Sequence, residues 1–348
     1  MFRDLADLTA DRLSEVLVQT GAATGRVSTV RTDSLDDGAG FLGTLARVHL
    51  TWDGEGPSSV VAKLPTTIPE NQQIVDHFGY DRREAGVYRD LRPWERVVSP
   101  RALAQDWDDA TGRGWLLLED LRHFEAADGV AGASDEQAFA TMVALARWHA
   151  AFWNDPRLST LAWLPASTDP IVAGYGTIFD MTWARCVEQL DGVEPEIEAA
   201  AQAGRRLFDQ AVHEFATGDR TLVHGDARLD NLRFGPDHAA LLDFQLAAHG
   251  RGVYDVAFFC AGSLRTDDRR RLEPQLLDRY RETLAEAGIE VDPDQLWRDY
   301  RLGHMLNLPN PVSAIAVVTP ADERGAEFLR RNARRGLAAV ADHVELVG

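Results

Sequence analysis

The chain has 348 residues, of which 45% are hydrophobic, and a formal net charge of −19 at pH 7. A chain of this length is longer than one compact core usually accommodates, so we expect two lobes. The negative charge argues against binding to nucleic acid or an anionic membrane. Cys186 and Cys260 do not make a disulfide framework, and no apolar run approaches the ~18 residues that span a membrane. The charged N-terminus is unlike a secretory signal, so we expect a cytosolic protein.

The first part of the chain predicts a small β-sheet lobe. Residues 8–20 have the spacing of an amphipathic helix, which Gly21 ends. Alternating and β-branched runs predict the strands of a sheet. These strands lie near residues 26–34, 44–52, 58–64, 101–107 and 114–120.

Gly38, Gly40 and Gly43 match the pattern G-x-G-x-x-G. A dinucleotide-binding fold needs a helix directly after the third glycine, but residues 44–52 alternate like a strand. A glycine loop between two strands, folded over nucleotide phosphates, is the kinase arrangement. A plain glycine-rich hairpin turn is the alternative.

Lys63 is the single lysine among the 36 Lys and Arg residues. It lies in a β-branched strand, where a compact ammonium suits phosphate oxygens better than the planar fork of arginine. A helix over residues 81–91, stopped by Pro93, is expected to supply a carboxylate partner. Glu84 is the best candidate, and Asp81 and Asp90 are the alternatives.

The chain becomes helical after these strands. Ser134 and Gln137 form a predicted capping box that opens a helix over residues 135–153. This helix is apolar on more than one face, so His149 is expected to be a hydrogen-bonded core histidine and not a ligand. The run 267–271, Asp-Asp-Arg-Arg-Arg, is expected to be a solvated helix face.

The most informative segment is His224-Gly225-Asp226-Ala227-Arg228-Leu229-Asp230-Asn231, followed by Asp243 after a predicted hairpin. The hairpin pairs residues 232–234 with 239–242 around the turn 235–237. Phosphoryl transfer needs a carboxylate that receives the proton of the attacking hydroxyl, which we assign to Asp226. It also needs an amide oxygen and a second carboxylate that hold Mg²⁺, which we assign to Asn231 and Asp243.

Each of these residues also has an ordinary interpretation. A His-Gly-Asp triplet alone is usually a turn, and an Asn alone is usually a cap or loop residue. Arg228 is a candidate for neutralising the γ-phosphate, and its alternative is a structural salt bridge. The joint spacing with the hairpin favours the kinase interpretation.

Taken together, these motifs resemble the aminoglycoside phosphotransferase and choline kinase-like superfamily. Residues 114–121, GWLLLEDL, resemble the strand and hinge that join the two lobes, and the backbone of Glu119 and Leu121 would then bond the adenine edge. Residues 145–153, LARWHAAFW, resemble the family's helix motif, and residues 243–245, DFQ, resemble ecdysteroid kinase-like members. Residues 226–231, DARLDN, instead resemble the bacterial form DxRxDN, so the subfamily stays open. Asp255 matches the helix-start aspartate that braces the catalytic loop.

The resemblance implies an α+β, two-lobed protein-kinase-like fold. A small antiparallel β-sheet lobe would occupy residues 1–121, and a larger, mainly helical lobe residues 122–348. Protein kinases have Arg after the catalytic-loop His and an Asp-Phe-Gly triplet, whereas this chain has Gly225 and Gln245. This departure disfavours a protein substrate.

We therefore expect an ATP- and Mg²⁺-dependent kinase that phosphorylates a hydroxyl of a small molecule. Lys63, Glu84 and the glycine loop would hold the phosphates. One alternative is a catalytically silent nucleotide-binding regulator. Another is a metal-dependent hydrolase that uses His224, Asp226 and Asp243, but it leaves the glycine loop unexplained.

The acceptor is not readable from the sequence. The superfamily binds it among large-lobe helices, here residues 155–215 and 262–348. Aromatic residues of the first segment form a pocket or plain core, and the second segment adds polar candidates. These residues are Trp163, Tyr175, Phe179, Met181, Trp183, His304, Asn307 and Asn310.

Overall fold

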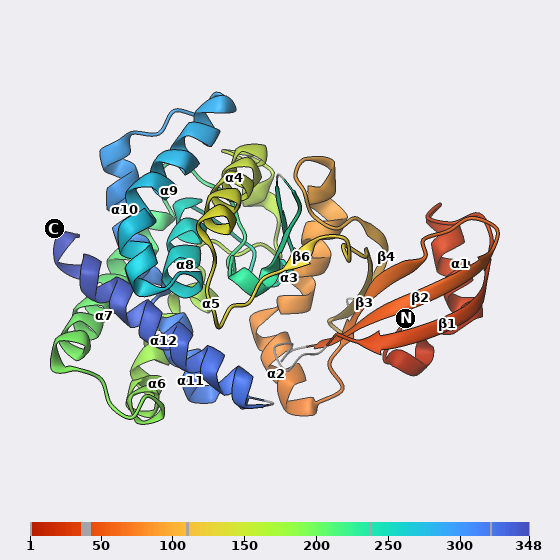
Figure 1. Cartoon of the computed structure of the whole chain (residues 1–348), viewed down its shortest axis with the longest axis horizontal. Helices are drawn as coiled ribbons and strands as arrows, with labels where there is room; N and C mark the ends of the chain where they lie inside the picture. Colours follow the sequence, from red (N-terminus) through yellow and green to blue (C-terminus); the bar gives the residue numbers. More distant parts are fainter. Residues whose placement is uncertain (1, 36–42, 109–110, 237, 321, 348) are drawn as a thin grey trace. The chain divides into compact units, whose positions relative to one another are not determined.

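The computed structural model describes residues 2–35, 43–108, 111–236, 238–320 and 322–347. Its internal contacts divide the chain into two compact units (Figure 1). The first unit comprises Met1–Glu95 and Ser99–His123, and the second comprises Arg96–Val98 and Phe124–Gly348. Each unit is described by itself below.

The first unit is built on an antiparallel sheet with the strand order β1-β2-β3-β5-β4. The predicted strands are confirmed. Their bounds are β1 Arg26–Ser34, β2 Gly43–Asp53, β3 Ser59–Pro65, β4 Ala102–Asp108 and β5 Arg113–Glu119. The helices of this unit are α1 Ala10–Gln19, α2 Pro69–Phe78 and α3 Tyr80–Gly86.

One face of this sheet forms the core of the first unit, because alternate side chains of each strand point to the same side. Val60, Ala62 and Leu64 of β3 share one buried core with Leu13 and Leu17 of α1. Burial of each such leucine contributes about 1.5–3 kcal/mol. The alternation places Lys63 on the opposite face of the sheet.

The segment after β3 contains two helices where the sequence predicted one. Helix α2 begins with Pro69 at its first turn and ends at Gly79, whose φ of 66° is left-handed. Helix α3 follows directly and continues as a π-helical turn over Val87–Leu91. The chain leaves this turn before Pro93, so the predicted end of the helix is confirmed.

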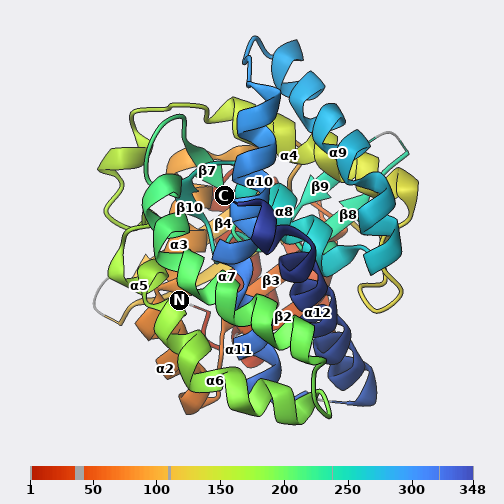
Figure 2. The same cartoon turned by 90° about the vertical axis from the view of Figure 1, so that its left-hand side faces the viewer.

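The second unit is mainly helical, and Figure 2 shows α7, α10 and α12 side by side. Its short strands form two small sheets, with the orders β6-β8-β9 and β10-β7. The helices are α4 Asp135–Ala151, α5 Pro170–Ala173, α6 Tyr175–Gln189, α7 Pro195–Phe215, α8 Val253–Ser263, α9 Thr266–Glu286, α10 Pro293–Asn307, α11 Pro309–Val317 and α12 Glu323–His343. The strands are β6 Glu125–Ala126, β7 Thr221–Val223, β8 Leu232–Phe234, β9 Ala239–Leu241 and β10 Ala248–Gly250.

Two local predictions for the second unit are confirmed. Ser134 and Gln137 form the reciprocal capping box of α4, with distances of 3.2 Å and 3.0 Å. Strands β8 and β9 pair as a hairpin, in which Leu232 lies opposite Leu241. Asp237 in its turn lies outside the described residues.

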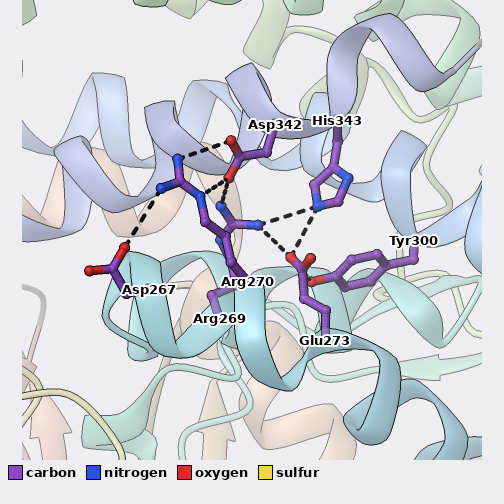
Figure 3. A network of polar contacts seen from close by, with 7 residues as sticks. All are labelled: Asp267, Arg269, Arg270, Glu273, Tyr300, Asp342 and His343. Atoms are coloured by element: carbon purple, nitrogen blue, oxygen red, sulfur yellow. Dashed lines mark hydrogen bonds and ion pairs between the residues drawn. The ribbon is translucent and has the colours of Figure 1, made fainter.

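The interpretation of residues 267–271 as a solvated helix face is wrong for Arg269. Arg270 is largely exposed, but Arg269 is only 1% exposed and contacts Glu273 and Asp342 (Figure 3). The hydroxyl of Tyr300 donates to the same Glu273 carboxylate at 2.9 Å. Because α10 and α12 pack on α9 at this point, one arginine of the run faces the interior with carboxylate partners.

No helix in the described ranges combines the length and the apolar character that crossing a membrane requires.

Candidate active site

The catalytic-loop segment of the second unit begins with a turn that only glycine fits. Gly225 has a φ of 84°, and a Cβ at this position would lie 2.0 Å from the backbone oxygen of Leu246. His224 is fully buried, and its Nε2 lies 2.9 Å from the Leu242 oxygen. The Asp226 N–H donates to His224 Nδ1 at 3.3 Å, so both ring nitrogens serve the backbone.

This role of His224 counts against the hydrolase alternative. A metal ligand must present a ring nitrogen to the ion, and here both nitrogens are engaged within the loop. His224 therefore shapes the loop and does not hold a metal.

Asp255 braces the loop from the first turn of α8, as the sequence resemblance implied. Its fully buried carboxylate accepts from the backbone N–H groups of His224 at 2.7 Å and Gly225 at 2.9 Å. It also lies 2.9 Å from His149 Nε2, and His149 Nδ1 lies 2.9 Å from the Tyr280 hydroxyl. His149 is thus a buried core histidine with hydrogen bonds on both nitrogens, which confirms that prediction.

Asp226 and Asn231 face each other across the loop. The Asn231 Nδ2 donates to the backbone oxygen of Asp226 at 2.9 Å and to its Oδ2 at 3.0 Å. Arg228 Nε lies 3.6 Å from the same Oδ2. The negative charge of Asp226 raises the pKa of the Arg228 guanidinium, and Asp230 and Asp243 add to this effect. Arg228 therefore remains a cation beside Asp226.

The β8–β9 hairpin returns the chain to this loop. The Leu242 N–H donates to the backbone oxygen of Asn231 at 2.9 Å. Asp243 therefore directly follows a residue that is bonded to the loop. Asp243 has a φ of 63°, and its Oδ1 accepts from the Gln245 N–H at 3.4 Å. This left-handed conformation costs free energy for a residue with a side chain, and such costs concentrate at functional sites.

The oxygen atoms of Asn231 and Asp243 fit a magnesium ion. Both hydrogen bonds of the Asn231 amide use Nδ2, so its Oδ1 is directed away from Asp226. An amide oxygen and a carboxylate are the hard oxygen ligands that Mg²⁺ takes together with phosphate oxygens. The donor set of this loop therefore suits a metal–nucleotide.

The first unit carries the predicted lysine pair. Lys63 Nζ in β3 lies 2.6 Å from Glu84 Oε2 in α3, and the two side chains are 15% and 3% exposed. Asp90, one of the alternatives, contacts Arg89 at 2.8 Å. Glu84 is thus a partner of Lys63, and its buried carboxylate holds the ammonium in place.

The hinge-like segment of the first unit borders a cavity of about 380 Å³. The backbone N–H of Glu119 donates to the Arg101 oxygen at 2.8 Å, so this N–H is already engaged within the sheet. The contact of the Glu119 and Leu121 backbone with an adenine stays a prediction. Asp120 accepts from Arg47 at 2.9 Å and from the Ser59 hydroxyl at 2.7 Å. Leu121 follows outside any strand.

Gly38 and Gly40 of the glycine loop lie outside the described residues. Gly43 is the first residue of β2, and a Cβ there would lie 3.2 Å from the Leu64 oxygen. The phosphate-covering role of this loop stays a prediction.

The aromatic and apolar candidates of the acceptor region differ in their exposure to solvent. Phe179 and Trp163 are buried core residues, and Met181 is 79% exposed. Trp183 stacks on Phe179 with a centroid distance of 5.3 Å. Asn310, in contrast, donates to the hydroxyl of Tyr254 at 3.2 Å, a contact that the sequence did not indicate.

Among the described residues, one further group of side chains brings three atoms that could bind a metal within 4.8 Å of one another. The group consists of Glu273, His304 and His343. The two imidazole rings stack in parallel, with an interplanar angle of 3°, so their nitrogens cannot converge on one ion. Arg269 contacts the Glu273 carboxylate and places a positive charge where a metal would bind. Glu273 and His343 instead take part in a polar network with Arg269 and Tyr300 (Figure 3).

Known proteins are similar to this chain in sequence or in fold. The sequence profile of the ecdysteroid kinase-like family matches residues 37–291. The N-acetylmuramate/N-acetylglucosamine kinase of Pseudomonas aeruginosa is 29% identical over 249 residues, which are 71% of this chain and 65% of that protein. The chain thus spans less than two thirds of the length of this curated relative.

Solved structures show the same fold at low sequence identity. Choline kinase from Cryptosporidium parvum has a TM-score of 0.58 at 12% identity, with 92% of this chain and 90% of that chain covered. A variant of aminoglycoside 2′-phosphotransferase-IIIa in its GDP complex has a TM-score of 0.52 at 14% identity, with 97% of both chains covered.

The chain belongs to the ecdysteroid kinase-like family. Its fold is the protein-kinase-like fold of small-molecule kinases, with an antiparallel sheet unit and a larger helical unit. The predicted fold class is therefore confirmed.

Proposed function

We propose that this protein is an ATP- and Mg²⁺-dependent phosphotransferase that moves the γ-phosphoryl group of ATP to a hydroxyl group of a small molecule. The observation that carries the proposal is the catalytic loop of the second unit. There Asn231 holds the Asp226 carboxylate, and the hairpin bonds the Asp243 segment to Asn231. A carboxylate base beside paired oxygen ligands is the minimum that phosphoryl transfer requires.

Asp226 is the proposed base. The Nδ2 of Asn231 and the Nε of Arg228 both approach its Oδ2, which leaves Oδ1 to accept the proton of the acceptor hydroxyl. As that proton leaves, the hydroxyl oxygen forms a bond to the γ-phosphorus. The bond between the γ-phosphorus and the β–γ bridging oxygen breaks, and ADP is the leaving group.

The remaining residues of the proposed site would hold the metal ion and the phosphate groups. Asn231 Oδ1 and the Asp243 carboxylate would hold Mg²⁺, which neutralises phosphate charge when it is bound. Lys63, fixed by Glu84, would bond α- and β-phosphate oxygens. Arg228 carries its positive charge next to the base and would stabilise the charge of the transferring group.

A small alcohol as acceptor is supported by the names of the related proteins. The Pseudomonas relative is named as a kinase of two amino sugars. The competing proposal, a silent nucleotide-binding regulator, predicts binding without transfer. The set Lys63, Asp226, Asn231 and Asp243 is complete in this chain, which favours an enzyme.

The test is nucleotide consumption by the purified full chain across a library of alcohols, with ATP and GTP in parallel and a no-acceptor control. Asp226→Asn should lower transfer by about 10²–10⁴, the usual effect of removing a positioned general base. Its affinity for Mg²⁺–ATP, measured by calorimetry, should stay within a few-fold of wild type.

Two further variants make the result specific. Asp243→Asn should abolish most of the Mg²⁺-dependent part of ATP affinity, because the ion loses its charged ligand. Asp128→Asn is the matched control, since Asp128 makes an exposed ion pair with Arg324. Transfer by Asp226→Asn at a rate near wild type would refute the proposed base.

A further inference from the structure

Tyr254 lies close enough to the proposed base for the charge of Asp226 to act on its phenol, although it is not part of the catalytic loop. It directly precedes Asp255, whose carboxylate binds the backbone of His224 and Gly225. Tyr254 is half-buried, and its ring lies 6.1 Å from the ring of Phe258, one turn further along α8. Its position in the chain thus fixes it next to the residues that lead into Asp226.

Two asparagines from neighbouring helices meet Tyr254. The Nδ2 of Asn310 in α11 donates to the Tyr254 hydroxyl oxygen at 3.2 Å, and the Nδ2 of Asn307 in α10 donates to its backbone oxygen at 3.4 Å. The phenol oxygen is therefore an acceptor in this contact, and its own proton can serve a different acceptor.

The side-chain oxygen of Asn307 lacks a hydrogen-bond partner among the described residues. Its side chain is only 5% exposed, and its Oδ1 is buried without a hydrogen-bond partner among the described residues. A buried amide oxygen without a partner costs about 1–3 kcal/mol. The cluster of Tyr254, Asn307 and Asn310, which we call the amide–phenol cluster, thus offers both an O–H donor and an amide acceptor.

The charges near this cluster favour a neutral ligand. Burial, then the negative charges of Asp255 and the neighbouring groups Tyr175 and Asp226, raise the pKa of Tyr254 far above its ordinary value. Tyr254 is therefore an uncharged donor at physiological pH. Of the two carboxylates, Asp255 is saturated by the loop and Asp226 is the proposed base, so neither is available to balance a bound cation.

We propose that the amide–phenol cluster is the acceptor subsite and that it binds an uncharged polyhydroxyl compound, such as a sugar, rather than a cationic alcohol. This inference rests on the proposed function, because it places the acceptor next to Asp226. A phenol donor and amide oxygens pair with adjacent hydroxyl groups, which each donate and accept a hydrogen bond. A quaternary or polyamine cation would find no carboxylate in this cluster to balance its charge.

The experiment compares Tyr254→Phe and Asn310→Ala with wild type in the full chain. The acceptors are the neutral N-acetylglucosamine and glucose and the cationic choline and kanamycin, each with Mg²⁺–ATP. We expect wild type to prefer a neutral sugar by at least tenfold in kcat/KM. Each variant should raise the KM for that sugar about five- to fiftyfold, with the KM for ATP unchanged, as expected for one lost polar contact in a binding site.

Tyr300→Phe is the matched control, because it removes a buried phenol hydroxyl that bonds Glu273 in a different part of the unit. It should lower the melting temperature and leave the sugar KM unchanged. Binding of N-acetylglucosamine without nucleotide, measured by saturation-transfer NMR, adds a readout that does not depend on turnover and should weaken in the Tyr254→Phe variant.

Two results overturn the inference. One is preferred phosphorylation of choline or kanamycin, and the other is an unchanged sugar KM in folded Tyr254→Phe and Asn310→Ala proteins. Either result leaves the proposed function intact, because phosphate is still transferred. The absence of ATP-dependent transfer to any alcohol of the library would instead refute the proposed function.

Discussion

Replacement of Asp255 by asparagine tests whether the loop is held by a buried carboxylate. The Asp255 side chain is fully buried, and its two oxygens meet N–H groups of His224, Gly225 and His149 at 2.7, 2.9 and 2.9 Å. Asparagine has the same shape but a single acceptor oxygen. Its amide nitrogen is a donor and would face another donor.

The magnitude follows from these contacts. If the asparagine oxygen keeps the bonds to His224 and His149, the Gly225 N–H loses its acceptor, which costs about 1–3 kcal/mol. The two remaining bonds lose their charge assistance, which costs about 0.5–1.5 kcal/mol each. We therefore expect Asp255→Asn to lower the free energy of unfolding by about 2–6 kcal/mol.

Guanidinium unfolding measures the total loss, and hydrogen exchange of the His224 and Gly225 amides locates it. Both amides should lose protection more than the amides of α12. Asp128→Asn, at an exposed ion pair, should change stability by less than about 1 kcal/mol. A loss below about 1 kcal/mol in Asp255→Asn, with both amides still protected, would refute the role assigned to this carboxylate.

Other substitutions test the remaining parts. Lys63→Arg should keep the fold and lower turnover, because a planar fork replaces the ammonium that bonds Glu84 at 2.6 Å; full turnover would reject a phosphate role. Gly225→Ala should lower both melting temperature and turnover, because a Cβ meets the Leu246 oxygen at 2.0 Å; an unchanged melting curve would contradict this. Burial, together with the neighbouring His343 and Arg269, lowers the pKa of His304 well below 6.5, so its stabilising effect is present at neutral pH and lost on acidification. Acidification from pH 7.5 to 5.5 should therefore lower the free energy of unfolding by about 1.4 kcal/mol, because His304 takes up a proton in the unfolded chain and not in the folded one. His304→Phe should be less pH-sensitive by this amount in urea titrations, and an identical pH slope would count against the burial argument.

Local patterns were sufficient for much of the fold. The alternation of residues 44–52 predicts β2 within one residue, and Ser134 predicts the start of α4. The hairpin and the Lys63–Glu84 pair were also predicted, because short-range spacing and residue chemistry determine them. Helix α2 was missed, although Pro69 and Gly79 are ordinary start and stop residues.

Contacts between distant segments were not predictable from one sequence. Arg269 is buried because Asp342, 73 residues away, meets it from α12. The contact of Asn310 with Tyr254 likewise joins two helices whose packing no local pattern indicates. The need for glycine at position 225 depends on the approach of Leu246, which belongs to the segment after the hairpin.

The single lysine has a consequence for proteolysis. A protease that cleaves only after lysine has one site in this chain, the bond between Lys63 and Leu64. That bond lies in β3, which is paired with β2 on one side and β5 on the other, so a protease reaches it only after the sheet opens. Such digestion yields two fragments, and its rate reports the opening of the first unit separately from that of the helical unit. A nucleotide bound at Lys63 should slow this cleavage in proportion to its occupancy.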